Sequence, residues 1–211
     1  MNSKDKTLVT WNEIAAIYDK TFMPLDIYDA SYAKFCKYLT MITPRVLDVG
    51  CGPGMISKYV SSKIPNSQIE GIDNAVNMIA LAKKNVPRGD FMTLSATDIS
   101  KLTGLYDGII SGFCLPYLKK TETKKFLKDC AEKLSANGIL YLSYVDGKYS
   151  NSHYQTGSSG HQLFFHYYET DYLIALLNKS GFKLLENLPI CYNKADGKNE
   201  IHTILILKRV I

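Results

Sequence analysis

The chain has 211 residues, of which 46% are hydrophobic, and it carries a formal net charge of +5. Such a chain can bury a sizeable core, and its length predicts one domain over residues 1–211. It contains no run approaching the roughly 18 apolar residues of a membrane span, and residues 1–10 hold only Leu8 and Val9 as bulky apolar residues after the first. We therefore expect neither a membrane segment nor a signal peptide, and we predict a cytoplasmic protein.

The basic charge is compatible with a nucleic-acid partner, but the distribution of the basic residues argues against one. Lysines gather along the polar side of the helical pattern 121–134, where a solvated outer face explains them. The only arginines are Arg45, Arg88 and Arg209, which form no arginine-rich stripe. The five cysteines contain no CxxC pair, so we expect reduced thiols and no metal site.

Short β-rich segments alternate with helical patterns from Val46 onward, which is typical of a parallel sheet covered by helices on both faces. Two helices, Trp11–Tyr18 and Ser31–Tyr38, are expected to cap the sheet within residues 1–44. The strands expected in residues 45–145 are Val46–Val49, Gln68–Ile72, Asp90–Leu94, Tyr106–Ser111 and Ile139–Tyr144. The helices expected after the first strand are Met55–Lys63, Ala75–Lys84, Thr121–Leu134 and Glu169–Ser180.

The last segment, residues 169–211, departs from this alternation after its helix. Phe182–Ile190 and Ile201–Lys208 are apolar runs with no helix between them, so they are expected to form an antiparallel hairpin on the sheet. Gly138 and Gly181 each follow a helical pattern and are expected to end it with a positive φ. The expected fold class is α/β, a Rossmann-like doubly wound sheet of seven strands, mostly parallel with an antiparallel C-terminal hairpin strand, flanked by helices.

The segment between the first strand and the next helix is the most informative part of the chain. It reads Val46-Leu-Asp-Val-Gly-Cys-Gly-Pro-Gly-Met55, a hydrophobic strand with one acid and then three alternating glycines. Glycine lets the backbone turn tightly and approach a ligand, because it has no Cβ. The dinucleotide pattern GxGxxG would need glycine at position 55, where this chain has Met55. The loop therefore predicts a ligand at the carboxyl end of the strand and argues against NAD.

The sequence DVGCGPG resembles the first motif of the class I S-adenosylmethionine-dependent methyltransferases, an acid followed by GxGxG. The resemblance covers about residues 46–208 and implies S-adenosylmethionine as the cofactor and S-adenosylhomocysteine as the product. It implies that Asp48 neutralises the amino group of the methionine part, and an acid buried at a strand end is costly without such a partner. The loop residues then expected at the cofactor are Gly50, Cys51, Gly52 and Gly54.

Two further acids match the pattern of this family. Asp73 ends the second strand, where the family uses a carboxylate to accept hydrogen bonds from both ribose hydroxyls. Asp98 follows the third strand, where the family's acid accepts from the adenine amino group and the next backbone N–H, here that of Ile99, reaches a ring nitrogen. As a loop aspartate, Asp98 could instead cap a helix. Asn74 and Met78 match the stretch after Asp73, in which the apolar residue packs on adenine; ordinary core packing is the alternative for Met78.

Gly112, directly after the fourth strand, completes the residues expected at the cofactor. Methyltransferases that act on amino groups of bases or of glutamine carry an Asn/Asp-Pro-Pro-Tyr-like motif here, whereas this chain has Ser111, Gly112, Phe113 and Cys114. The absence of that motif favours a small-molecule acceptor. Because the methyl group sits on an electrophilic sulfonium, the protein's main tasks are to align the acceptor and exclude water, and no metal is needed. A histidine or tyrosine base can assist.

Two segments supply the catalytic candidates. Trp11-Asn-Glu-Ile-Ala-Ala-Ile-Tyr18-Asp19 resembles the WxxxAxxYD lead-in of many such methyltransferases, in which the tyrosine lies over the cofactor and shapes the acceptor site. An aromatic face is also favourable beside a sulfonium, so Tyr18 is expected at both the cofactor and the reaction centre. The long segment 146–168 is expected to be a lid or acceptor loop. Within it His166 is the candidate base, with simple packing of the lid as the alternative.

The favoured function is methyl transfer from S-adenosylmethionine to a small molecule by direct in-line displacement. A protein or RNA methyltransferase is the first alternative, and only the basic charge supports it. A non-catalytic protein that keeps the fold is the second. The retained acids at positions 48, 73 and 98 argue against a decayed pocket.

Overall fold

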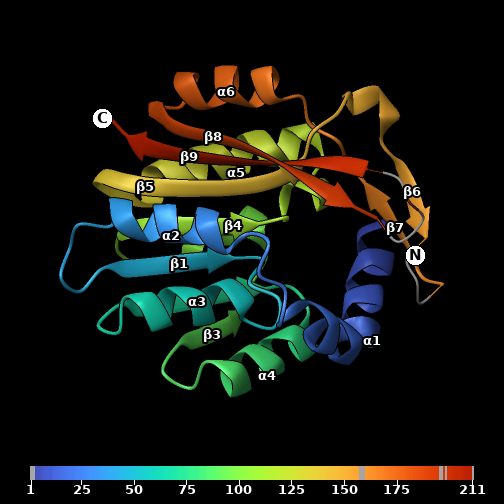
Figure 1. Ribbon diagram of the computed structural model, residues 1–211, viewed down its shortest axis with the longest axis horizontal. Helices are drawn as coiled ribbons and strands as arrows, with labels where there is room; N and C mark the ends of the chain where they lie inside the picture. The colour runs from blue at the N-terminus through green and yellow to red at the C-terminus, as the bar shows by residue number, and fades with distance from the viewer. Residues whose placement is uncertain (1–2, 157–159, 195–196, 198, 211) are drawn as a thin grey trace.

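The structure is a computed structural model that describes residues 3–156, 160–194, 197 and 199–210. Its central element is a seven-stranded sheet of order β3-β2-β1-β4-β5-β9-β8 (Figure 1). Strands β1 to β5 run parallel, and β9 pairs antiparallel with both β5 and β8. The strands are β1 (Arg45–Val49), β2 (Gln68–Asp73), β3 (Asp90–Thr93), β4 (Tyr106–Gly112), β5 (Leu134–Val145), β8 (Phe182–Asn193) and β9 (Asn199–Arg209). The predicted sheet and its antiparallel C-terminal hairpin are confirmed.

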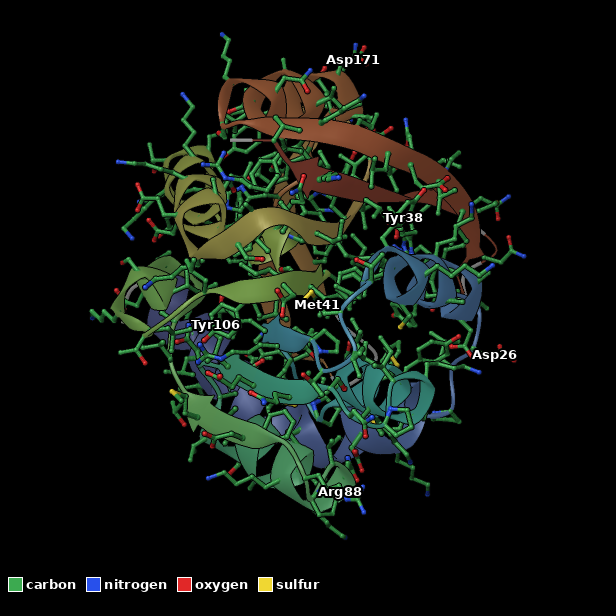
Figure 2. The ribbon with its side chains drawn as sticks, turned by 90° about the vertical axis from the view of Figure 1, so that its left-hand side faces the viewer. Asp26, Tyr38, Met41, Arg88, Tyr106 and Asp171 are labelled. Carbon is green, nitrogen blue, oxygen red and sulfur yellow. The ribbon has the colours of Figure 1, made fainter. Side chains whose placement is uncertain are left out.

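Helices cover both faces of this sheet. Helices α2 (Asp29–Tyr38), α3 (Met55–Lys63) and α4 (Val76–Asn85) bury residues in one core cluster. Helices α5 (Lys120–Lys133) and α6 (Thr170–Lys179) and the 3-10 helix η1 (Ala96–Lys101) bury theirs in another. Figure 2 views the sheet from the amino ends of the parallel strands, with Tyr106 at the first residue of β4, and shows helices on either side of it.

The carboxyl ends of the parallel strands carry a separate layer. Helix α1 (Ser3–Phe22) lies there beside a small antiparallel hairpin, β6 (His153–Thr156) and β7 (Gln162–Phe165) (Figure 1). The strand order reverses between β1 and β4, and in open α/β sheets ligands bind in the crevice at the carboxyl ends of the strands at this point. None of the helices in the described ranges is long and apolar enough to cross a membrane.

Three local expectations are corrected. Segment 146–168 is not only a loop, because it contains a 3-10 turn, η3 (Tyr149–Asn151), and the β6–β7 hairpin, whose pairing satisfies backbone groups that a loop would leave to solvent. Helix α1 is longer than the predicted Trp11–Tyr18. After α5, within the first residues of β5, it is Asn137 and not Gly138 that has a positive φ, of 65°. Gly138 instead supplies space, since a Cβ there would lie 2.9 Å from the Ser135 carbonyl. Gly181 has the expected positive φ, of 81°.

Candidate functional site

The glycine loop after β1 has a backbone shape that disfavours other residues. Gly50, Gly52 and Gly54 have φ of 69°, 52° and 86°, values that L-residues with a side chain rarely adopt. The amides of Gly50 and Cys51 both donate to the Ile72 carbonyl, at 2.8 and 3.0 Å. The loop is therefore fixed to the end of the neighbouring strand β2.

Asp73, the last residue of β2, holds the loop from its side chain as well. One carboxylate oxygen accepts from the Gly52 amide at 3.0 Å, and the other accepts from the Ala75 amide at 2.9 Å. Burial raises the pKa of this carboxyl, and the backbone hydrogen bonds oppose that rise. Each carboxylate oxygen can accept two hydrogen bonds, so the group keeps acceptor capacity for a ligand hydroxyl.

Asp48, near the end of β1, is a buried carboxyl group with one unpartnered oxygen. The side chain is 1% exposed. Its Oδ2 accepts from the amide and the hydroxyl of Ser57 on α3, at 3.2 and 2.7 Å, whereas Oδ1 has no partner in the described structure. Burial raises the pKa of Asp48 to about 7, while the Ser57 hydrogen bonds lower it. An unpaired acceptor beside the glycine loop fits a positively charged ligand group, which would restore the ionised form.

The residues expected around adenine differ in their exposure and contacts. Asn74 is exposed, whereas Met78 is 2% exposed and packs with Ala15, Trp11 and Tyr18 between α1 and α4. In this structure Met78 is therefore a core residue between α1 and α4. Asp98 is part of η1, where its carboxylate pairs with Lys101 at 3.3 Å. The cap of η1 is Ser95, which accepts from the Thr97 amide, so helix capping does not explain Asp98.

Ile99 and Gly112 are also predicted at the cofactor, where they would act mainly through their backbone. The Ile99 side chain is fully buried in the core, which leaves its amide as the group able to reach a ligand. Gly112 ends β4, and a Cβ there would lie 2.4 Å from Cδ1 of Ile56. The carboxyl ends of β4 and β1 meet directly, since a Cβ on Gly50 would lie 3.1 Å from Cβ of Cys114. The loop therefore contacts the residues that follow β4 at the switch point of the sheet.

Phe113, between Gly112 and Cys114, has a strained backbone. Its φ is 52°, which is rare for a bulky residue. The amide of Phe113 donates to both the hydroxyl and the carbonyl oxygen of Ser143, at 3.0 and 3.1 Å. Such strain persists only where surrounding contacts impose it, and it is concentrated at functional sites. No local pattern in the sequence indicates this conformation.

The residues of the lead-in motif lie on one face of α1, toward α4 and the glycine loop. Tyr18 lies over the loop, since a Cβ on Gly52 would be 4.0 Å from Cε1 of Tyr18. Burial, with a smaller contribution from Asp73, raises the pKa of Tyr18 to about 12. Asp19 accepts from Asn85 of α4 at 2.7 Å, and the same amide group donates to the Pro53 carbonyl of the loop at 2.9 Å. Trp11, Ala15, Tyr18 and Asp19 thus form one helical stripe toward α4 and the loop.

The β6–β7 hairpin closes over α1 and the end of β4. The ring of Tyr117 lies 5.3 Å from that of Trp11 and 5.9 Å from that of Phe165, in edge-on contacts. His161 Nε2 is 2.8 Å from the Glu13 carboxylate. These contacts join α1, the segment after β4 and the hairpin into one cover over the switch point.

His166, the predicted base, lies in a different aromatic cluster from Tyr18. Its ring stacks on Tyr149 at 5.4 Å and contacts Phe164 at 4.8 Å, whereas Tyr18 contacts Trp11 and Phe22. Its Nδ1 is buried without a hydrogen-bond partner in the described structure, and burial lowers its pKa. The structure does not bring the two catalytic candidates together.

A second histidine, which sequence reasoning missed, does lie against the end of β4. His202 on β9 places Nδ1 2.6 Å from the Tyr28 hydroxyl, and its Nε2 is 3.7 Å from the Glu200 carboxylate. Phe113 contacts both rings. No local motif could have indicated this cluster, because Tyr28 and His202 are 174 positions apart. Among the described residues, no group of three His, Cys, Asp or Glu side chains could hold a metal ion.

Comparison with known proteins finds similar methyltransferases. Residues 46–138 match a family model described as a methyltransferase domain. Protein 235L of Invertebrate iridescent virus 6 is 37% identical over 113 residues, which are 53% of this chain and 40% of that protein. The malonyl-[acyl-carrier protein] O-methyltransferase of Bacillus cytotoxicus is 35% identical over 109 residues, 51% of this chain and 37% of that enzyme. The chain thus matches less than half the length of these relatives.

Solved structures share the whole fold at low sequence identity. The 1,6-didemethyltoxoflavin-N1-methyltransferase of Burkholderia thailandensis, with S-adenosylhomocysteine bound, has a TM-score of 0.72 at 14% identity and covers 100% of this chain and 92% of that one. The magnesium protoporphyrin IX methyltransferase of Synechocystis PCC 6803, with S-adenosylmethionine bound, has a TM-score of 0.69 at 16% identity, over 99% and 98% of the chains. Residues 46–138 thus match a methyltransferase domain, and the chain as a whole has the fold of S-adenosylmethionine-dependent methyltransferases.

Proposed function

We propose that this protein transfers the methyl group of S-adenosylmethionine to a small-molecule acceptor. The observation that carries the proposal is the convergence, at the switch point, of a loop of positive-φ glycines with two carboxyl groups, the buried Asp48 and the half-buried Asp73. The bound cofactor supplies a methyl group on a positively charged sulfur, which needs no metal to react. The protein has to bind it, orient the acceptor behind the methyl group, and exclude water.

Each of the three acids has a distinct task in this proposal. Asp73 accepts from the ribose hydroxyls while it holds Gly52 and Ala75 in place. The unpartnered Oδ1 of Asp48 accepts from the amino group of the methionine part. Asp98 accepts from the adenine amino group, and the Ile99 amide donates to the ring. Tyr18, above Gly52, supplies an aromatic surface at the sulfonium.

A small acceptor is supported by the cover over the site. Trp11, Tyr117 and Phe165 pack α1, the segment after β4 and β7 against one another, and the Glu13–His161 pair adds a polar contact. A covered site suits an acceptor that enters whole and is then shielded from water. The similar Bacillus and Burkholderia enzymes are named for a malonyl group on a carrier protein and for a toxoflavin precursor, respectively.

The test uses S-adenosylmethionine labelled in its methyl group, together with extract from the source cells. The extract is separated by ultrafiltration into a small-molecule filtrate and a retained fraction of protein and RNA, and each is incubated with the purified protein. We expect label to enter filtrate compounds, and to do so much more slowly with an Asp73→Ala variant. Label confined to retained material, and released by protease or ribonuclease, would refute a small-molecule acceptor and identify the acceptor as protein or RNA.

A further inference from the structure

Resting on the proposed function, we infer that Tyr28, His202 and Glu200 form a proton relay that deprotonates the acceptor during methyl transfer. Tyr28 is the residue that contacts the acceptor, and His202 and Glu200 act through it. The inference also narrows the substrate class. A relay of this kind serves an acceptor that carries a proton on its nucleophilic oxygen or nitrogen, such as a hydroxyl or a ring N–H. It has no task with a carboxylate that is already ionised.

The central pair of the relay is short and enclosed. The Tyr28 hydroxyl lies 2.6 Å from Nδ1 of His202, and the two residues are 4% and 7% exposed. Tyr28 precedes α2, whereas His202 lies on β9. The ring of Tyr192 stacks on His202 at 4.6 Å with an angle of 13° between the planes. Two distant segments thus hold a phenol and an imidazole in hydrogen-bond geometry.

The pair lies on the acceptor side of the proposed site. Phe113 is in contact with both members, at 5.3 Å from Tyr28 and 4.9 Å from His202 between ring centroids. The next residue, Cys114, contacts the Gly50 position of the cofactor loop. The relay is therefore beside the end of β4 and away from Asp73 on β2, where the ribose binds. The strained φ of Phe113 at this junction is an independent mark of a functional position.

The surrounding charges determine the protonation state of His202. Its Nε2 is 3.7 Å from Oε2 of Glu200, whose other oxygen accepts from Lys194 at 2.9 Å. Burial lowers the pKa of His202, and Glu200 opposes that shift. His202 is thus neutral at rest, with its proton on Nε2 facing Glu200 and with Nδ1 free to accept from Tyr28. Burial also raises the pKa of Tyr28, so its hydroxyl stays protonated until the acceptor reacts.

Glu200 also connects the relay to solvent. It lines a cavity of about 420 Å³ together with Asp146, Tyr167 and neighbouring residues at the carboxyl end of β5. A charge that forms on His202 can therefore be compensated by a carboxylate that faces open space. This position explains why a carboxylate is placed within a mostly apolar strand.

The transfer step balances with these groups. The acceptor oxygen or nitrogen forms a bond to the methyl carbon, and the carbon–sulfur bond breaks with its electron pair left on sulfur. The acceptor proton passes to the Tyr28 oxygen while the Tyr28 proton passes to Nδ1 of His202. The resulting imidazolium is stabilised by Glu200 and returns its proton to solvent through the cavity.

The first test measures the protonation state of His202 in the absence of any acceptor. Nitrogen-15 NMR of the histidine side chains reports which imidazole nitrogen carries the proton. We expect His202 to be neutral with the proton on Nε2, and we expect its pKa to fall further in Glu200→Gln. A proton on Nδ1 would overturn the relay, because His202 could then not accept from Tyr28. The titratable groups that face the pair are Tyr18 of α1, Tyr32 of α2, Tyr141 of β5, Tyr192 of β8, Lys194 and Glu200.

The second test measures transfer of labelled methyl into the small-molecule filtrate as a function of pH. Tyr28→Phe is expected to lower the rate about a hundredfold, as for loss of a general base, with S-adenosylmethionine affinity unchanged. Glu200→Gln is expected to lower the pH of half-maximal rate, because it lowers the pKa of His202. Tyr38→Phe is the matched control, because its hydroxyl also makes a side-chain hydrogen bond, to Glu186 at 3.0 Å, but Tyr38 is the last residue of α2, whereas Tyr28 precedes the first.

The outcomes separate the two proposals. If wild-type protein binds S-adenosylmethionine and Tyr28→Phe transfers methyl at the wild-type rate, the relay is wrong and the proposed function stands. If wild-type protein binds no S-adenosylmethionine, the proposed function fails and the relay falls with it.

Discussion

The Asp73 carboxylate accepts a 3.0 Å hydrogen bond from the Gly52 amide and so joins the end of β2 to the middle of the glycine loop. Its other oxygen holds the Ala75 amide just before α4. The acid that would bind the ribose therefore also sets the shape of the loop on which the cofactor lies. Substitutions at Asp73 should affect both tasks.

Asp73→Asn tests this double role. Asparagine has one acceptor oxygen, so it cannot serve both amides and both ribose hydroxyls. Hydrogen bonds to a charged group contribute about 1.5–3 kcal/mol each, and we expect the dissociation constant for S-adenosylmethionine to rise by at least about tenfold. Asp90→Asn, an exposed position on β3, is the matched control. Isothermal titration calorimetry that finds equal affinity in Asp73→Asn and wild type would contradict the assignment.

Asp48→Asn is expected to stabilise the free protein at alkaline pH. Burial raises the pKa of Asp48 from 3.8 to about 7, so the folded state binds this proton more tightly than the unfolded state. The contribution of Asp48 to the free energy of unfolding is therefore largest below pH 3.8 and is lost as the pH rises through about 7. Urea denaturation at pH 8 should show asparagine to be more stable by up to about 4 kcal/mol. A variant less stable than wild type at pH 8 would refute this.

The same carboxyl group should make cofactor binding depend on pH. Below about pH 7 Asp48 is protonated in the free protein, and a cationic amino group then loses its partner. We expect the affinity for S-adenosylmethionine to fall as the pH drops from 8 to 6 in wild type and to stay nearly constant in Asp48→Asn. Titrations with the same slope in both proteins would show that Asp48 does not face the ligand.

Gly54→Ala should destabilise the fold more than an alanine at an open glycine. Gly54 has φ of 86°, and a Cβ there would lie 3.3 Å from the backbone of Ala82. Gly197 has φ of 78°, with nothing within 4 Å of its Cβ position. Backbone strain alone costs about 1–2 kcal/mol, and overpacking adds about 1–3 kcal/mol. Urea denaturation should therefore rank Gly54→Ala well below Gly197→Ala, and equal stabilities would contradict the close contact of α3 and α4.

Asn85→Ala should loosen α1. The Asn85 amide group donates both to Asp19 of α1 and to the Pro53 carbonyl of the loop. Loss of two hydrogen bonds worth about 1 kcal/mol each is expected to speed hydrogen exchange severalfold in peptides spanning 11–22. Asn178→Ala on the exposed side of α6 is the control and should leave that exchange unchanged. Unaltered protection of α1 in Asn85→Ala would show that this bridge does not hold the helix.

The sequence alone predicts most of the sheet, because strands and helices alternate with distinct periodicities and the glycine loop is a local pattern. Asp48 and Asp73 could be found for the same reason, since each lies at a fixed place relative to a strand. The β6–β7 hairpin could not be found, because its strands are four residues each and lie in a segment rich in Gly and Ser. The positive φ at Asn137 was also missed, since the neighbouring glycine is the usual choice.

The Tyr28–His202 pair was still harder to predict from the sequence. Its members come from the two ends of the chain and meet only because β9 inserts between β5 and β8. His202 follows an isoleucine in a largely apolar strand, so its pattern is that of an ordinary core residue. His166 attracted attention instead because it lies among many tyrosines, and its role as a base stays a prediction.

The most direct measurement of the central claim is a calorimetric titration of the purified, cofactor-free protein with S-adenosylmethionine, S-adenosylhomocysteine and NAD. We predict one site per chain for the first two, with micromolar affinity, and no binding of NAD, since Met55 replaces the glycine that its fingerprint requires. A folded protein that binds neither sulfur ligand, or that binds NAD more tightly than either, would contradict the account.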